Sequence, residues 1–144
     1  MGLTWSNKMS VGNESIDSEH KKILDLVNEV ELVIRTKDSV LFSQALRLLE
    51  ETTRLHFDNE EKIAHAIHHP FVDHNLEHKY ILGEFQIIKD ELANLQGRWS
   101  ESVAEHYYMF LSTWAVEHVM EDDMKMKPLL EKFPYDFKPD SFND

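Results

Sequence analysis

Residues 71–95 read FVDHNLEHKYILGEFQIIKDELANL, and this stretch decides the kind of fold that the chain can adopt. Its apolar residues, together with His74 and His78, recur at intervals of three and four positions, which is the spacing of one face of an α-helix. The stretch therefore predicts an amphipathic helix that carries two histidines on its buried face. The apolar residues of this line are Phe71, Ile81, Phe85, Ile88, Leu92 and Leu95.

Three further segments repeat this spacing, and none alternates as a β-strand would. The four predicted helices lie at about residues 18–36, 39–66, 71–95 and 100–123. Asp17 or Ser18 would cap the first helix. The predicted buried positions of the first helix are Ile16, Ile23, Val27, Val30 and Ile34. Those of the second are Leu41, Ala45, Leu48, Thr52, Ile63 and Ile67, and those of the fourth are Val103, Tyr107, Phe110 and Trp114. Short loops between long amphipathic helices predict an all-α fold, an antiparallel up-down-up-down four-helix bundle.

The remaining segments are predicted to belong to the same single domain, residues 1–144. Residues 1–16 are predicted to form a non-helical arm in which Trp5 packs on the bundle. Residues 124–144 are rich in polar residues and proline, so we expect an irregular tail with a short helix near residues 128–132.

The composition excludes several classes of protein. The formal net charge is −12, which argues against binding to nucleic acid because little positive charge is available to replace phosphate counterions. The chain has no cysteine, so disulfides, thiolate zinc sites and cysteine nucleophiles are excluded. No apolar run is long enough to span a membrane. We therefore expect a soluble, cytoplasmic protein.

Polar residues interrupt each predicted helical line at positions where burial is costly. These residues are His20, His56, Glu60, His74, His78 and His118. They lie at the start of the first and third helices and toward the end of the second and fourth. In an up-down-up-down bundle, these four places share one end of the core. Six polar groups there could hardly satisfy one another, so the sequence predicts a metal centre.

Residues 74–78, HNLEH, also match the zinc-protease signature H-x-x-E-H. A tetrahedral zinc ion takes at most about four protein ligands, which is fewer than the residues predicted to meet here. A peptidase also needs a substrate cleft, which a packed bundle core does not supply. Glu77 lies about 100° from His78 around the helix and is expected to point away from the metals. The other histidines are expected at the surface or behind the ligands: His65, His68, His69 and His106.

The number of predicted ligands favours two metal ions. Two octahedral ions offer about twelve coordination positions, and five imidazoles, two bridging carboxylates and one bridging solvent oxygen would fill all but one. A nitrogen-rich site with one open position suits iron that binds a small diatomic ligand. Glu60 supplies one carboxylate, and HVMEDD offers three choices for the other: Glu121, Asp122 and Asp123. Asp122 shares the face of His118 on an ideal helix, whereas Asp123 lies about 140° away.

The chain resembles bacterial hemerythrins over nearly its whole length. Five pieces carry the resemblance in the family's order and spacing: Trp5 near the start, VGNESIDSEH (11–20), HFDNEE (56–61), HPFVDHNLEH (69–78) and WAVEHVMEDD (114–123). The family's ligand pair on the fourth helix is H-x-x-x-x-D, which selects Asp123 as the second carboxylate. To bring Asp123 onto the face of His118, the helix would need a widened, π-type turn near its end.

The resemblance implies a cofactor of two iron ions bridged by an oxo or hydroxo group, Glu60 and Asp123. The histidines would divide between the ions as His74, His78 and His118 on one, and His20 and His56 on the other. Dioxygen would bind reversibly at the ion with two histidines. From their helical phase, the side chains expected to face the open position and exclude water are Phe57, Ile81 and Trp114.

Three kinds of function are compatible with such a site. We expect reversible oxygen binding for carriage, storage or delivery, and no enzymatic role, because one open position leaves no room for a substrate beside oxygen. An oxygen or redox sensor that acts on a partner protein is the second possibility, although the chain shows no appended output domain. The enzymatic alternatives are a di-iron oxidase and a nitric-oxide reductase.

Overall fold

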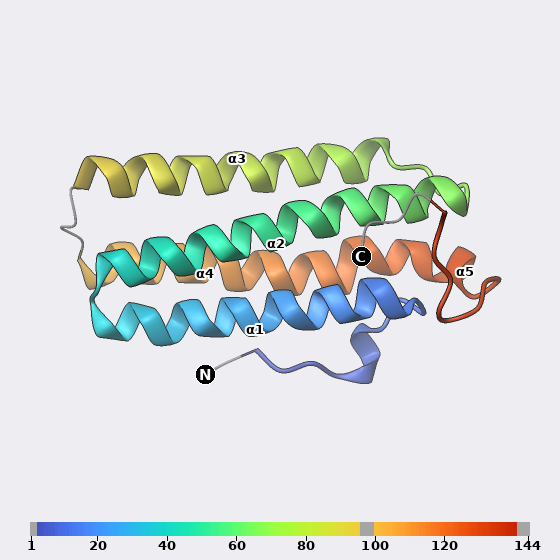
Figure 1. The fold of residues 1–144 in the computed structure, drawn as a ribbon, viewed down its shortest axis with the longest axis horizontal. Coiled ribbons are helices and arrows are strands. Elements are labelled where there is room, and N and C mark those ends of the chain that lie inside the picture. Colours follow the sequence, from blue (N-terminus) through green and yellow to red (C-terminus); the bar gives the residue numbers. More distant parts are fainter. Residues whose placement is uncertain (1–2, 96–99, 141–144) are drawn as a thin grey trace.

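The fold is a bundle of four long helices. The computed structural model describes residues 3–95 and 100–140. The long helices are α1 (Glu14–Thr36), α2 (Ser39–Ala66), α3 (Val72–Leu95) and α4 (Glu101–Glu117). They run up and down in turn, and the described residues contain no strand, so the predicted all-α bundle is confirmed (Figure 1). Within the described ranges, no helix combines the length and the apolar character needed to cross a membrane.

Capping residues mark the starts of α2 and α4 and the end of α1. Asp38 precedes α2, and its carboxylate accepts hydrogen bonds from two backbone N–H groups at 2.9 and 3.1 Å. Lys37 adopts a left-handed conformation with φ 59°, which closes the turn between α1 and α2. Ser100 precedes α4, and its hydroxyl accepts from the N–H of Val103 at 3.2 Å. The predicted starts of these two helices are therefore confirmed.

The start of α1 differs from the prediction. The helix begins at Glu14 because Asn13 caps it, accepting a hydrogen bond from the N–H of Ile16 at 3.1 Å. Asp17, which was expected to be a cap, is buried inside the first turn, where it accepts from the hydroxyl of Ser10 at 2.5 Å. Asp17 therefore ties the arm to the helix.

Two of the predicted irregular segments are more ordered than expected. The arm is shorter than residues 1–16 and includes a 3₁₀ turn at Asn7–Met9, while Trp5 packs on the main core as predicted. At the other terminus, a 3₁₀ turn at Asp123–Met126 leads into the short helix α5 (Lys127–Leu130), so the irregular tail begins later than predicted.

Beyond α5 the tail crosses the start of α1. The carbonyl of Tyr135 accepts from the N–H of Glu14 at 2.8 Å, and its hydroxyl donates to Asp17 at 2.8 Å. The side-chain amide of Asn13 donates to the carbonyl of Phe137 at 3.0 Å. These bonds hold the tail over the end of the bundle where α1 starts and α2 ends (Figure 1).

The buried face of α2 was predicted wrongly over its first half. Leu41 and Leu48 are 43% and 49% exposed, whereas Phe42, Leu46 and Leu49 are buried. This half of α2 carries apolar residues on two faces, so helical spacing alone does not decide which face packs. Both choices lead to the same buried position for His56, and the predicted site is unaffected.

A polar layer divides the core into two apolar clusters. The larger cluster fills the middle and the far end of the bundle and includes Ile23, Val27, Leu46, Phe57, Phe85, Leu111 and Trp114. The smaller cluster lies at the other end and includes Val11, Ile16, Ile63, Phe71, Met126 and Leu130. The buried histidines, Glu60 and Asp123 lie between the two.

Candidate metal centre

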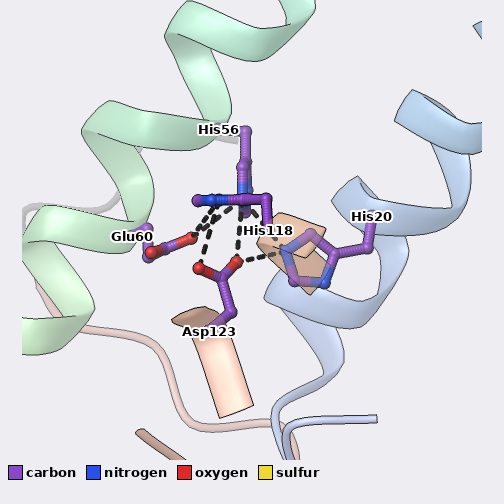
Figure 2. Close-up of side chains that lie close together, drawn as sticks. All are labelled: His20, His56, Glu60, His118 and Asp123. Carbon is purple, nitrogen blue, oxygen red and sulfur yellow. Dashed lines mark hydrogen bonds and ion pairs between the residues drawn. The ribbon is translucent and has the colours of Figure 1, made fainter. Parts of the chain in front are cut away.

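Seven polar side chains, contributed by α1, α2, α3 and the turns that follow α4, meet in this layer. Each is at most 8% exposed. Their ligand atoms form two overlapping groups, and within each group the atoms lie within 4.8 Å of one another. One group consists of His20, His56, Glu60, His118 and Asp123, which Figure 2 shows, and the other of Glu60, His74, His78, His118 and Asp123. The structure therefore brings together all seven residues that the sequence singled out.

The carboxylate of Asp123 lies among four imidazoles. One oxygen, Oδ2, lies 2.5 Å from Nε2 of His20 and 3.5 Å from Nε2 of His56. The other, Oδ1, lies 2.7 Å from Nε2 of His74 and 3.1 Å from Nε2 of His118. Each oxygen therefore faces a different side of the cluster, as the oxygens of a bridging carboxylate do.

Glu60 has the same relation to the cluster. Its Oε1 lies 2.5 Å from Nε2 of His74 and 3.5 Å from Nε2 of His78. Its Oε2 lies 2.9 Å from Nε2 of His56 and 3.8 Å from Nε2 of His118. The two carboxylates together can thus join the two groups of imidazoles.

A π-turn places Asp123 in the cluster. His118–Asp122 form this turn after α4, and the N–H of Asp123 donates to the carbonyl of His118, five residues earlier. Asp122 is partly exposed, and its carboxylate lies 3.9 Å from Nδ1 of His118, the nitrogen that faces away from the cluster. Glu121 is exposed. The predicted widened turn is therefore confirmed, and Asp123 is the carboxylate that reaches the imidazoles of the cluster.

Several buried atoms of the cluster lie close to other polar atoms but make no hydrogen bond of regular geometry with the described residues. Among them are both carboxylate oxygens of Glu60 and the Nε2 atoms of His78 and His118. Buried polar atoms are normally satisfied, and unpaired ones are costly. Imidazole nitrogens and carboxylate oxygens are ligands for transition metals, so metal ions would satisfy these atoms together. The residues present therefore fit a metal centre.

Burial and the two carboxylates act in opposite directions on the histidines. Burial disfavours the charged imidazolium and lowers the pKa of His20 and His78. Burial also acts on the other three, but hydrogen bonds and charge from the carboxylates outweigh it. The pKa is raised to about 10 for His74 and about 9 for His118, and well above its usual value for His56. Metal binding requires neutral nitrogens, so it would compete with these protons.

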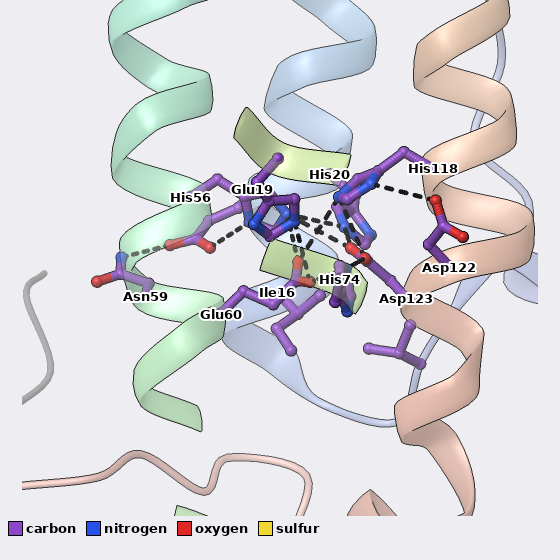
Figure 3. A network of polar contacts seen from close by, with 12 residues as sticks. Ile16, Glu19, His20, His56, Asn59, Glu60, His74, His118, Asp122 and Asp123 are labelled. Carbon is purple, nitrogen blue, oxygen red and sulfur yellow. Dashed lines mark hydrogen bonds and ion pairs between the residues drawn. The ribbon is translucent and has the colours of Figure 1, made fainter. Parts of the chain in front are cut away.

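The carboxylate of Glu19 contacts the Nδ1 side of His56, opposite the nitrogen that faces the cluster (Figure 3). Its Oε1 lies 2.8 Å from Nδ1 of His56, and its Oε2 accepts from the side-chain amide of Asn59 at 2.7 Å. A carboxylate on Nδ1 fixes the proton there and turns Nε2 toward a metal. Sequence reasoning missed Glu19. Its position directly before His20 was the available signal, but which side chain it would meet depends on how α1 and α2 pack.

Glu77 approaches the cluster from outside. It belongs to neither of the two buried groups, but one of its oxygens forms a third group with atoms of His118 and Asp122, all within 4.8 Å of one another. A hydrogen bond with Asp122 and burial raise the pKa of Glu77 to about 7. Its closeness to His118 was not predicted.

Aromatic rings cover the cluster on the side of the main core. Phe57 stacks on His78 with ring centroids 3.6 Å apart, and the ring of Trp114 lies 6.0 Å from that of His118. Ile81 is buried in the same apolar cluster. The remaining histidines lie at the surface or are half-buried, as predicted: His65, His68, His69 and His106.

The fold and the cluster define a class of protein, a four-helix bundle whose core holds histidine and carboxylate ligands for metal ions. The family model described as "Hemerythrin HHE cation binding domain" matches residues 11–130. The chain belongs to this hemerythrin family, which confirms the resemblance inferred from its motifs.

Curated relatives agree with this assignment. The chain is 25% identical over 121 residues to "Bacteriohemerythrin" of Pseudomonas aeruginosa, a match that covers 84% of this chain and 76% of the relative. It is 27% identical over 128 residues to "Hemerythrin-like protein" of Naegleria gruberi, covering 89% and 93% of the two chains. It is 24% identical over 129 residues to "Bacteriohemerythrin" of Clostridium acetobutylicum, covering 84% and 95%.

Proposed function

We propose that this chain holds two iron ions and uses them to bind dioxygen reversibly, for carriage, storage or delivery. The observation that carries this proposal is the convergence of five imidazole Nε2 atoms on two buried carboxylates in one layer of the core. Membership of the hemerythrin family supports iron as the metal. A cytoplasmic location is part of the same proposal and rests on the composition alone.

The two ligand groups suggest how the ions would be held. The three histidines of α3 and the π-turn would bind one ion, and the two histidines of α1 and α2 the other. Glu60 and Asp123 belong to both groups, which supports a bridging role for each. His118 also belongs to both, and family resemblance assigns it to the ion with three histidines.

The surrounding residues would control access and protonation. When bound, the iron pair supplies the electrons that dioxygen takes up on binding and returns on release. Phe57 and Trp114 bury the ligands on the core side and keep water away. Glu19 holds the proton of His56 on Nδ1, so that Nε2 presents its lone pair. Five imidazoles make the centre poorer in electrons than the carboxylate-rich sites of di-iron oxidases, which supports binding over turnover.

Iron content and oxygen binding test this proposal together. We expect about two irons per chain and, in stopped-flow experiments on the reduced protein, an oxygenated spectrum that disappears on deoxygenation. His118→Ala should lower iron content, whereas His106→Ala is the matched control because His106 is an exposed histidine of α4. One zinc per chain with peptidase activity would contradict the proposal. Rapid loss of the oxygenated spectrum with formation of an oxidised product would instead support an oxidase or a redox sensor.

A further inference from the structure

Two buried polar atoms next to the metal centre have no hydrogen-bond partner among the described residues. They are the hydroxyl oxygen of Thr53 and the indole nitrogen Nε1 of Trp114. Thr53 is 0% exposed and Trp114 is 5% exposed. Neither is among the metal ligands, and leaving a buried donor unpaired is costly. Both atoms therefore need an explanation.

Both residues lie on the same side of the cluster. Thr53 precedes His56 by three positions on α2, and Trp114 precedes His118 by four on α4. Both helices run toward the end of the bundle that holds the ligands (Figure 1). Thr53 and Trp114 therefore lie about one helical turn from the ligands, on the side of the main core. Trp114 belongs to the main core, where its ring centroid lies 6.3 Å from that of Phe57.

Residues 3–95 and 100–140 offer neither atom a hydrogen-bond partner. A helical threonine can donate to the carbonyl of the preceding turn, but the hydroxyl of Thr53 makes no such bond. The ring of Trp114 lines a groove of about 440 Å³ between α3 and α4, together with Ile81 and Met109. Its nitrogen is nevertheless buried rather than exposed to solvent in that groove. The groove brings the surface close to the layer in which both atoms lie.

We propose that the Thr53 hydroxyl and the Trp114 indole N–H donate hydrogen bonds to the small ligand that binds at the metal centre. An indole N–H can only donate, so the ligand must be an acceptor. Dioxygen that has drawn negative charge from the metals is such an acceptor, and anions such as azide share this chemistry. This inference rests on the proposed function and adds two specificity-determining residues to it.

The variants Thr53→Val and Trp114→Phe remove the two donors. Thr53→Val keeps the shape of the side chain, whereas Trp114→Phe also removes one of the two fused rings, so Thr53→Val is the cleaner test. Each should release dioxygen about tenfold faster than the wild type, measured by stopped flow per metal-loaded centre. Azide bound to the oxidised protein should dissociate faster by a similar factor. Tyr107→Phe is the matched control, because it removes a hydroxyl from a buried ring of α4 far from the metals, where it bonds Glu91. Its release rates should equal those of the wild type.

Urea unfolding of the metal-free proteins separates this role from a structural one. Thr53→Val should leave stability unchanged or raise it, because valine replaces an unpaired hydroxyl with an apolar group of the same shape. A loss of stability with unchanged release rates would overturn the inference and show that Thr53 has a partner within the protein. Wild-type release rates in both variants would also overturn it, while the proposed function would stand. A wild type that binds neither dioxygen nor azide would refute the proposed function itself.

Discussion

Replacing Asp123 by asparagine should disable the metal centre, whereas the same change at Asp122 should leave it intact. The carboxylate of Asp123 is fully buried, and its oxygens lie 2.5–3.5 Å from the Nε2 atoms of four histidines. Asp122 is partly exposed and lies 3.9 Å from Nδ1 of His118, on the outer side. Two identical changes at neighbouring positions thus separate the bridging role that we propose for Asp123 from a general loss of charge at the end of α4.

The expected sizes of the two effects follow from burial. In the metal-free protein, Asp123→Asn removes one of the two buried counter-charges of the protonated histidines and leaves only Glu60, which should cost about 3 kcal/mol of unfolding free energy. That corresponds to a fall in Tm of roughly 6–12 °C for a domain of this size. The contact of Asp122 is long and partly exposed, so Asp122→Asn should cost less than about 1 kcal/mol.

Thermal unfolding of the metal-free proteins and iron analysis after loading measure these effects. The wild type and Asp122→Asn should each hold about two irons per chain, and Asp123→Asn about one or fewer. The placement of Asp123 by the π-turn would be refuted if Asp122→Asn lost more iron than Asp123→Asn. Equal stability of the two metal-free variants would refute the expectation that replacing the buried Asp123 costs more unfolding free energy than replacing the partly exposed Asp122.

Three further predictions concern the surroundings of the cluster. Glu19→Gln should weaken iron binding about 10- to 100-fold, because it loosens the hold on His56; titration against a chelator measures this, and unchanged affinity would contradict it. The pKa of His74 is raised from 6.5 to about 10, so its stabilising contribution to the metal-free protein is complete below pH 6.5 and is lost as the pH rises to about 10. The difference in unfolding free energy between the wild type and His74→Gln should shrink over that range, and a constant difference would count against the assignment. Phe57→Ala should destabilise the protein by about 3–5 kcal/mol and speed loss of the oxygenated spectrum, because it uncovers His78; an unchanged decay rate would show that the ring does not protect the site.

The layer of histidines and carboxylates was predictable because polar residues stand there at positions where the helical spacing otherwise places apolar ones. A histidine within an apolar helical line is informative only when the topology places others at the same level, and His20, His56 and His118 meet that condition. Helical spacing alone favoured Asp122 over Asp123, since the π-turn adds a residue that an ideal helix does not contain. The family pattern, not periodicity, identified Asp123.

Other features depended on packing that spacing cannot resolve. The first half of α2 has two apolar faces, and packing in the bundle, including the contact of Phe42 with Tyr107 of α4, decides that Phe42 is buried and Leu41 exposed. The start of α1 was missed because Asp17 resembles a cap, whereas its carboxylate bonds to the arm and the tail. Glu19 could not be paired with His56 before the relative rotation of the two helices was known.

The polar layer also divides the bundle into two parts that differ in cooperativity. Ile16, Ile63 and Met126 belong to the small cluster beyond the layer, which the rest of the core does not support directly. Without metal, this end of the molecule should open more readily than the main core, and its backbone amides should exchange with deuterium sooner. Metal binding would then join the two parts into one unfolding unit, so that the occupancy of the metal centre would also determine whether the protein unfolds in one step or two.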